Sequence, residues 1–332
     1  MRTIFTLGSS VLATALVTAC SQSVGVTGAT PTQAVQGYSV ANVTGPNGRG
    51  PREVAALRGW ISPKKSKEQL LYVSDSIDGV IDIFSVPDYS LVGQITDGLD
   101  FPEGIATDKK GNLYVSNLFG NTVTVYPEGQ TSPSVTLSEP DGPDDVAVAG
   151  NGDVLAGDTD GGVDVYKPGE TSASSRLTNS NITSVSGIGI DGNDNVYAVG
   201  TYTFSNSSGP QPAVVKYAAL GSSGKNLKLS GLIEPAGALV DKHGNIVISD
   251  FKLPGVNLYK PGKKNPFATI ASAGPADRIA INNKQNLIYV PQSTYGDVSI
   301  FKYPSGKLVQ DIPISSGDGF ASGTALSPPA KL

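Results

Sequence analysis

The chain has 332 residues, of which 39% are hydrophobic and 16% are charged, and it contains 40 glycines. This composition is typical of a globular chain rich in strands and turns, and not of a helical or disordered one. With 24 basic and 29 acidic residues the formal net charge is −5, which gives no electrostatic basis for binding a phosphate backbone. We therefore expect no nucleic-acid partner.

The N-terminal segment has the pattern of an export signal. Met1 and Arg2 precede an apolar run over residues 4–17, which is shorter than the roughly 20 residues that a membrane-spanning helix needs. The run ends in Val17-Thr18-Ala19-Cys20, which resembles the bacterial lipobox, where signal peptidase acts and the cysteine sulfur is acylated. The resemblance implies a signal peptide over residues 1–20. It also implies a lipoprotein that acyl chains on Cys20, including palmitate, attach to the membrane.

The remainder of the N-terminal region predicts where the protein is placed. Residues 21–52 are rich in Ser, Thr, Gly, Gln and Pro without a sustained period, which is typical of a flexible tether. Cys20 is the only cysteine, so an intrachain disulfide is excluded. By resemblance to lipoprotein sorting, Ser21 favours the outer membrane where a cell has one. We expect a domain over residues 53–332 in the bacterial cell envelope, outside the cytoplasm.

The domain is built from repeats. Each repeat contains short apolar or alternating strands separated by turn residues such as Asp108-Lys109-Lys110-Gly111. An aromatic residue closes the third strand of each repeat, with steps of 42, 40, 51, 42 and 42 residues, at Phe84, Tyr126, Tyr166, Tyr217, Tyr259 and Phe301. Six repeats of about four strands predict an all-β, six-bladed β-propeller of four-stranded antiparallel blades.

The two ends of the domain predict how the ring closes. The first repeat begins at a second strand, Leu70-Leu71-Tyr72-Val73, whereas the segment Gly323-Thr324-Ala325-Leu326 after the last repeat has the pattern of an innermost strand. We expect these N- and C-terminal strands to share one blade, with Trp60-Ile61 in the same sheet. The propeller is expected to be monomeric.

The repeat resembles the NHL repeat over roughly residues 60–330. The resemblance rests on Pro102-Glu103-Gly104-Ile105-Ala106-Thr107-Asp108, then Gly111-Asn112-Leu113-Tyr114-Val115-Ser116-Asn117, then Val123-Thr124-Val125-Tyr126. Related six-bladed propellers include gluconolactonase-like and strictosidine-synthase-like enzymes. The resemblance therefore implies the fold and leaves both binding and hydrolysis open.

One face of such a propeller carries the mouth of the central channel, and here its predicted residues are acidic. Before the innermost strands stand Glu103, Asp144, Ser186, Ala236, Ala276 and Ser322, and after the second strands stand Asp75, Asn117, Asp158, Gly200, Asp250 and Gln292. Carboxylate and amide oxygens suit a hard cation such as Ca²⁺. The metal-ligand candidates are Glu103, Asn117, Asp144, Asp145 and Asp158; the alternative is that these residues cap turns.

The resemblance also allows the enzyme hypothesis to be examined. Gluconolactonase-like enzymes hold a divalent ion with Glu, Asn and Asp before innermost strands. Glu103 and Asp144 match in part, but no residue matches the asparagine. An incomplete ligand set weakens both carbonyl polarisation and water activation, and we assign no catalytic residue.

The long step between Tyr166 and Tyr217 predicts an insertion over residues 201–210 that carries Tyr202 and Phe204. Aromatic side chains beside a channel mouth can contact a glycan, a peptide or a small molecule; a loop that packs on its neighbour is the equal alternative. Candidate ligand-binding residues are Tyr202, Phe204, Asp75 and Asp250. Three functions stay open: a non-enzymatic binding module for an envelope protein, glycan or small ligand, a metal-dependent lactone or ester hydrolase, or a purely structural envelope protein.

Overall fold

The computed structural model describes residues 59–61, 69–139, 141–203, 209–317 and 319–329. These ranges form strands and turns without a helix, and accordingly none of them contains a helix long and apolar enough to cross a membrane. The predicted signal peptide with Cys20 and the predicted tether over residues 21–52 lie outside the described residues.

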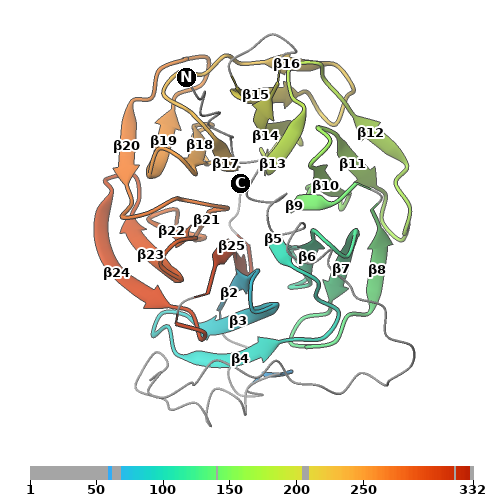
Figure 1. Ribbon diagram of the computed structural model, residues 1–332, viewed down its shortest axis with the longest axis vertical. Helices are drawn as coiled ribbons and strands as arrows, with labels where there is room; N and C mark the ends of the chain where they lie inside the picture. The colour runs from blue at the N-terminus through green and yellow to red at the C-terminus, as the bar shows by residue number, and fades with distance from the viewer. Residues whose placement is uncertain (1–58, 62–68, 140, 204–208, 318, 330–332) are drawn as a thin grey trace, which may run out of the picture.

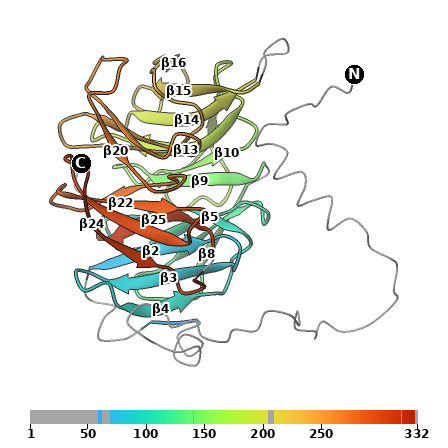
Figure 2. The same cartoon turned by 60° about the vertical axis from the view of Figure 1, so that its left-hand side comes forward.

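Six antiparallel sheets stand around a central axis, which confirms the all-β, six-bladed propeller (Figure 1). The turned view in Figure 2 places β2, β3 and β4 at one end of the ring and β13–β16 at the opposite end. In each blade the strands follow one another outward from the axis, so that β5, β9, β13, β17, β21 and β25 line the centre.

The strands of the first three blades have the following bounds. The first blade contains β1 (Trp60–Ile61), β2 (Leu70–Asp75), β3 (Val80–Ser85), β4 (Leu91–Ile95) and β25 (Ala321–Ser327). The second contains β5 (Pro102–Thr107), β6 (Leu113–Asn117), β7 (Thr122–Tyr126) and β8 (Val135–Ser138). The third contains β9 (Pro143–Val148), β10 (Val154–Asp158), β11 (Val163–Tyr166) and β12 (Ser175–Leu177).

The other three blades complete the ring. The fourth contains β13 (Ser184–Ile190), β14 (Val196–Tyr202), β15 (Gln211–Tyr217) and β16 (Gly224–Asn226). The fifth contains β17 (Pro235–Val240), β18 (Ile246–Asp250), β19 (Gly255–Tyr259) and β20 (Ala268–Ala271). The sixth contains β21 (Ala280–Ile281), β22 (Leu287–Gln292), β23 (Asp297–Lys302) and β24 (Lys307–Pro313).

The first blade closes the ring as the sequence predicts. Its innermost strand β25 pairs with β2, with Leu326 opposite Leu71 and Thr324 opposite Val73. The short β1 pairs with the outermost strand β4 of the same sheet, with Ile61 opposite Gly93. One blade therefore joins strands from both ends of the propeller.

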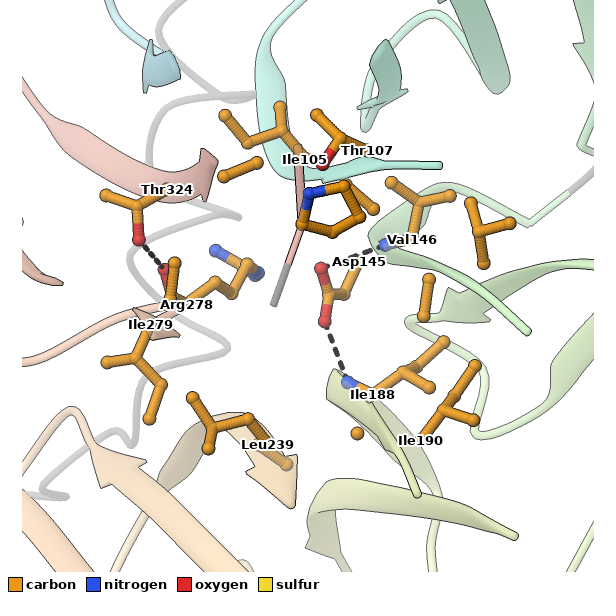
Figure 3. Close-up of a pocket in the computed structure, with 18 of the residues that line it drawn as sticks. Ile105, Thr107, Asp145, Val146, Ile188, Ile190, Leu239, Arg278, Ile279 and Thr324 are labelled. Carbon is orange, nitrogen blue, oxygen red and sulfur yellow. Dashed lines mark hydrogen bonds between the residues drawn. The ribbon is translucent and has the colours of Figure 1, made fainter. Parts of the chain in front are cut away.

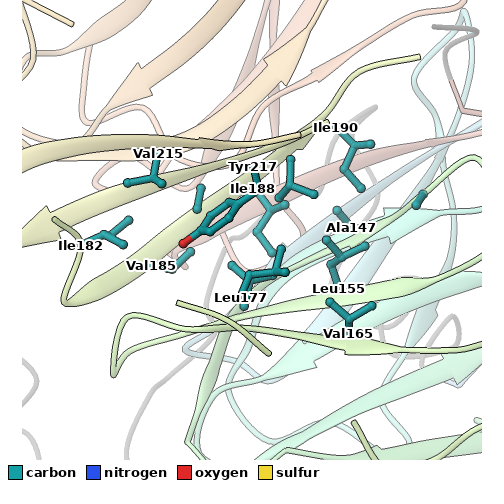
Figure 4. Close-up of a cluster of buried hydrophobic side chains, with 14 of the residues drawn as sticks. Ala147, Leu155, Val165, Leu177, Ile182, Val185, Ile188, Ile190, Val215 and Tyr217 are labelled. Atoms are coloured by element: carbon teal, nitrogen blue, oxygen red, sulfur yellow. The ribbon is translucent and has the colours of Figure 1, made fainter. Parts of the chain in front are cut away.

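The cores lie between neighbouring blades. Leu155 and Val165 of the third blade pack with Ile188, Val215 and Tyr217 of the fourth in one buried cluster (Figure 4). Burial of each such side chain contributes about 1.5–3 kcal/mol. A blade covers its neighbour's apolar face, so the repeats depend on one another for stability.

The aromatic residues that define the repeat are buried at the ends of the third strands. Tyr126, Tyr166 and Tyr259 each donate a hydrogen bond from Oη to a backbone carbonyl, those of Asp97, Ser138 and Ser230 respectively. These distances are 2.6, 2.7 and 2.8 Å. The aromatic ring thus fills the core while its hydroxyl fixes the connection that arrives from the preceding blade.

Candidate functional site

The same two kinds of connection lie on one side of the ring in every blade, and we call this side the upper face. They comprise the turns between second and third strands and the connections from one blade's outermost strand to the next blade's innermost strand. The sequence predicts this face to be acidic. In the structure most of the predicted carboxylates are buried. Other acidic residues of the same connections are exposed beside apolar side chains: Asp78, Asp97, Asp100, Asp141 and Asp160.

Nine large apolar side chains among the described residues are exposed, and five of them stand on the upper face: Ile77, Phe119, Ile233, Leu253 and Tyr295. We call these five the apolar arc, because they belong to the fifth, sixth, first and second blades, which are consecutive around the ring. Ile77 is 66% exposed, Tyr295 55% and Phe119 51%. Covering apolar side chains of this exposure with a partner removes them from water and lowers the free energy of the complex.

Two aromatic contacts support the apolar arc from below. Phe119 stacks on the half-buried Phe101, with ring centroids 4.3 Å apart. Phe251, which lies in the fifth blade's turn beside Leu253, faces Phe320 at 6.4 Å. These contacts hold aromatic side chains in place before binding, which lowers the ordering cost of an interface.

At the centre of the ring, the channel is crossed by one buried arginine, Arg278 (Figure 3). Its Nη1 lies 2.7 Å from Glu103 Oε2 and 2.9 Å from Asp277 Oδ1, and its Nη2 lies 2.5 Å from Asp144 Oδ1. Nε donates to the carbonyl of Ser186 at 3.1 Å. One guanidinium therefore links the innermost strands of the second, third, fourth and sixth blades.

Arg278 is the functional feature that sequence reasoning missed. Gly104 directly follows Glu103 in the second blade. Strand pairing aligns Arg278 with this glycine and with the glycines at the same repeat position of three other blades, Gly187, Gly237 and Gly323. Neighbouring innermost strands approach closely there: a Cβ on Gly187 would lie 2.4 Å from the Ala236 carbonyl oxygen. An arginine among these glycines is a departure from the repeat, and that departure was the available signal.

The same pairing corrects the alignment of the sixth repeat. Ala276 pairs with Gln292 in the way that Pro102 pairs with Asn117, so Asp277 and not Ala276 is the equivalent of Glu103. The prolines misled the sequence alignment, because Pro275 stands one residue earlier relative to the pairing than Pro102, Pro143 or Pro235. The channel mouth therefore has a third carboxylate, on Asp277.

Burial controls the protonation of these groups. Desolvation raises the pKa of Glu103 to about 8, with the Arg278 charge acting in the opposite direction. Desolvation likewise raises the pKa of Asp145 to about 7 and that of Asp277 to about 6. It also raises the pKa of Asp144, while its carboxylate neighbours hold the pKa of Arg278 above its usual range. Arg278 is charged at all physiological pH values, and the carboxyl groups titrate around it.

The gluconolactonase-like ligand set does not fit a divalent ion at this mouth. Glu103 and Asp144, the two residues that match the family pattern, both accept hydrogen bonds from Arg278. Asp145 points toward the backbone of the fourth blade and accepts hydrogen bonds from the Val146 and Ile188 amides at 2.9 and 2.7 Å (Figure 3). A guanidinium occupies the position between the carboxylates that an ion would need.

The other metal candidates, Asn117 and Asp158, have separate partners within their own blades. Asn117 is buried in the second blade, where its amide donates to Thr124 Oγ1 at 3.0 Å and its oxygen accepts from the Asp100 amide. Asp158 accepts from Arg176 at 2.6 Å in the third blade. The structure therefore gathers Glu103 and Asp144 around Arg278, with Asp145 beside them, and gives Asn117 and Asp158 contacts outside this cluster.

Two of the ligand-binding candidates, Asp75 and Asp250, are fully buried and stabilise loops of the upper face. Asp75 accepts from Ser316 Oγ at 2.6 Å and from the Phe320 amide at 3.2 Å, and so attaches the loop before β25 to the end of β2. Asp250 accepts from the Ile233 and Leu253 amides, each at 2.7 Å. It therefore fixes two members of the apolar arc.

The predicted insertion is described only in part. Tyr202 ends β14, is half-buried and packs against the core between the third and fourth blades. The predicted partner Phe204 lies outside the described residues. Tyr202 thus contributes to packing, and in the part of the chain that the structure describes, Phe119 and Tyr295 are the largely exposed aromatic side chains of the upper face.

Below Arg278 the channel opens into a cavity of about 190 Å³. Ile105, Val146, Ile188, Leu239 and Ile279 form its apolar wall, and Pro329 also lines it (Figure 3). Its polar members are Thr107, Asp145, Arg278 and Thr324. Strand register places Asp145 and Arg278 at the end of the innermost strands that is nearer the upper face. The Arg278 cluster thus separates this cavity from the upper face.

Comparisons with known proteins support the propeller fold and assign no family. Neither a protein-family model nor a curated protein sequence matches the chain, so the resemblance to NHL repeats stays a prediction. The structure is similar to a chain in the crystal structure of a nidogen/laminin complex, with TM-score 0.63 and 14% identity, over 78% of this chain and 98% of that one. It is also similar to a Bacteroides caccae protein of unknown function, with TM-score 0.60 and 13% identity, over 78% of this chain and 99% of that one. These similarities show the propeller fold.

Proposed function

We propose that this chain is a lipid-anchored, non-enzymatic binding module of the bacterial cell envelope that holds a partner protein on its apolar arc. The observation that carries the proposal is the exposure of Ile77, Phe119, Ile233, Leu253 and Tyr295 on consecutive blades of one face. Aromatic and aliphatic anchors of this kind dominate protein interfaces, where they become desolvated at the centre of the contact.

The spread of the apolar arc favours a protein over a small ligand. Its members stand on four blades around the ring, and the Arg278 cluster fills the centre between them. Small molecules bind in concave pockets that enclose most of their surface, whereas anchors distributed over a broad face suit a second protein surface. The nidogen/laminin complex is an example of this fold in a protein–protein complex.

The proposed anchoring follows from the sequence pattern at Cys20. A lipid on Cys20 and a tether over residues 21–52 would place the propeller outside the cytoplasm and close to a membrane. A membrane-attached module then meets partners in or on the envelope. The alternative of a metal-dependent lactonase requires Glu103 and Asp144 to hold an ion, and the pairing of both with Arg278 weakens it.

The proposal is tested by changing the apolar arc without changing the fold. Phe119→Ser with Leu253→Ser removes two exposed anchors from the upper face. The matched control, Phe267→Ser with Leu308→Ser, removes an exposed aromatic and an exposed leucine from the outermost strand regions. The full-length lipoprotein and both variants are purified from their native cells in mild detergent, and co-purifying proteins are quantified.

We expect a stoichiometric partner with the unchanged protein and the control, and at least a tenfold lower recovery with the upper-face variant, since two interface anchors together contribute more than about 1.4 kcal/mol. Equal recovery with both variants would place the interface elsewhere. If no protein co-purifies with any of the three preparations and the unchanged protein hydrolyses a lactone, the enzyme hypothesis would be favoured.

A further inference from the structure

A second group of buried carboxylates lies away from the channel, in the third blade. Glu139, Asp158 and Asp164 each offer an oxygen, and these three oxygens lie within 4.8 Å of one another. Glu139 and Asp158 are completely buried and Asp164 is 4% exposed. Burial of three carboxylates this close together costs free energy unless cations or protons compensate their charge.

Two oxygens of this group have no hydrogen-bond partner among the described residues. Glu139 Oε2 lies 2.6 Å from Tyr166 Oη, whose one hydroxyl hydrogen is shared with the Ser138 carbonyl, and Glu139 Oε1 is buried without a partner. Asp158 Oδ2 accepts from Arg176 at 2.6 Å, but Asp158 Oδ1 is likewise buried without a partner. Buried polar atoms are nearly always paired, so two orphan oxygens in one cluster indicate an absent positive partner.

Arg176 supplies too little positive charge for its surroundings. It contacts Asp158 and Asp164 at 2.6 and 2.8 Å, pairs with Asp160, and lies 3.8 Å from Asp141. With Glu139 this makes five carboxylates, and Arg176 is the one basic side chain of the described residues that forms an ion pair with any of them. An additional divalent cation would reduce the excess negative charge.

Comparison between blades shows that Glu139 and the two clustered unpaired oxygens distinguish the third blade. Glu139 follows the carbonyl that accepts from Tyr166, and the equivalent positions in the second and fifth blades are glycines, Gly98 and Gly231. Where the third blade has Asp158 and Asp164, the second has the neutral pair Asn117 and Thr124. The first blade has Asp75 and Asp82 there, and neutral donors such as Ser315 and Ser316 pair with them. The ordinary strand ladder of a blade therefore does not require these charges.

We propose that Glu139, Asp158 and Asp164 form a divalent-cation site with Ca²⁺ as the ion of best fit. The donors are all carboxylate oxygens, which hard cations prefer, and their ability to bind through one or both oxygens suits the irregular coordination of calcium. Arg176, which contacts Asp158 and Asp164, also lines a surface hollow together with Asp160, so one side chain separates the carboxylates from that hollow. Arg176 then acts as a positioning residue that orients Asp158 and Asp164.

The test is calcium titration by calorimetry on the full-length protein in detergent, after chelator treatment and dialysis, at pH 8. We expect one site per chain with a dissociation constant in the micromolar range, and at least tenfold weaker binding for Glu139→Gln, which keeps the side-chain shape. Glu170→Gln, an exposed change in the same blade, serves as the matched control and should bind like the unchanged protein.

Folding is monitored for each variant by circular dichroism, and Asp158→Asn provides a second variant if Glu139→Gln does not fold. Calcium should also raise the unfolding temperature of the unchanged protein and of Glu170→Gln, but not that of Glu139→Gln. Absence of binding up to about 1 mM calcium, the weak end of protein calcium sites, would overturn the proposal. Binding that Glu139→Gln leaves unchanged would overturn it as well.

Discussion

At the scale of single residues, Arg278 determines the character of the channel mouth. It is the one charged side chain that contacts Glu103, Asp144 and Asp277 together, and it does so from a repeat position that glycine occupies in four other blades. Because its carboxylate neighbours are buried, removal of the guanidinium leaves their charges without compensation.

Arg278→Met should therefore destabilise the protein by about 3–5 kcal/mol at pH 8. The loss should be smaller at pH 5, below the raised pKa values of Glu103 and Asp277, where these two groups need no counter-charge. Urea unfolding at both pH values measures the difference. Lys252→Met, which removes an exposed pair with Glu234, is the control and should change stability by less than about 1 kcal/mol. A loss below that limit for Arg278→Met at pH 8 would contradict the structural role of the cluster.

The same groups predict how stability depends on pH. Since burial raises the folded-state pKa of Glu103 to about 8 and of Asp145 to about 7, the folded protein binds more protons than the unfolded chain between pH 5 and 8. Stability must then decrease as pH rises through this window. Hydrogen bonds lower the pKa values of Asp191 and Asp241 against the effect of burial. The titration of these two groups therefore changes stability only at pH values below this window.

We expect a lower unfolding temperature at pH 8 than at pH 5, and a flatter profile for Glu103→Gln, which carries no titrating proton. Differential scanning calorimetry across the window measures both profiles. A profile that rises toward pH 8, or one that Glu103→Gln leaves unchanged, would show that Glu103 is ionised throughout.

At the scale of elements, β25 carries the closure of the ring. It pairs with β2 on one side, and Arg278 donates from its amide to the Ser322 carbonyl at 3.0 Å while accepting from the Thr324 amide at 3.1 Å on the other. β25 thus joins the first blade to the sixth. Its Leu326 lies in the same buried cluster as Leu71 and Tyr289.

Leu326→Ala should cost about 2–5 kcal/mol, because it opens a cavity where the two ends of the propeller meet. Leu308→Ala in β24, where the side chain is 48% exposed, is the matched control and should change stability by less than about 0.5 kcal/mol. Equilibrium unfolding in urea compares them. Equal effects would mean that the closure contributes little to stability.

Much of this element structure could be predicted from the sequence, and the reasons are physical. The spacing of Phe84, Tyr126 and their equivalents follows the blade repeat, because every blade buries one ring at the same place. The closing strand was recognisable because the first repeat lacked an innermost strand. The site was harder to predict: the direction of Arg278 depends on a one-residue register at Ala276, and the exposure of Phe119 depends on neighbouring loops.

At the scale of the whole molecule, the upper face has a closed centre and an apolar periphery. The Arg278 cluster fills the centre, so binding on the upper face falls to the apolar arc, whose members Ile77, Phe119, Leu253 and Tyr295 stand on four consecutive blades. A partner that engages the arc must contact opposite parts of the arc at once, which a protein surface can do and a small ligand cannot.

Site-specific photo-crosslinking in native cells tests this claim most directly. A photoreactive phenylalanine is placed at Phe119 in the second blade, at Tyr295 in the sixth, and at the exposed Phe267 beside β20 as the control. We expect positions 119 and 295 to form an adduct with the same envelope protein and position 267 to form none. Absence of an adduct at both upper-face positions, or an equal adduct at position 267, would contradict the proposal that the apolar arc is the binding surface.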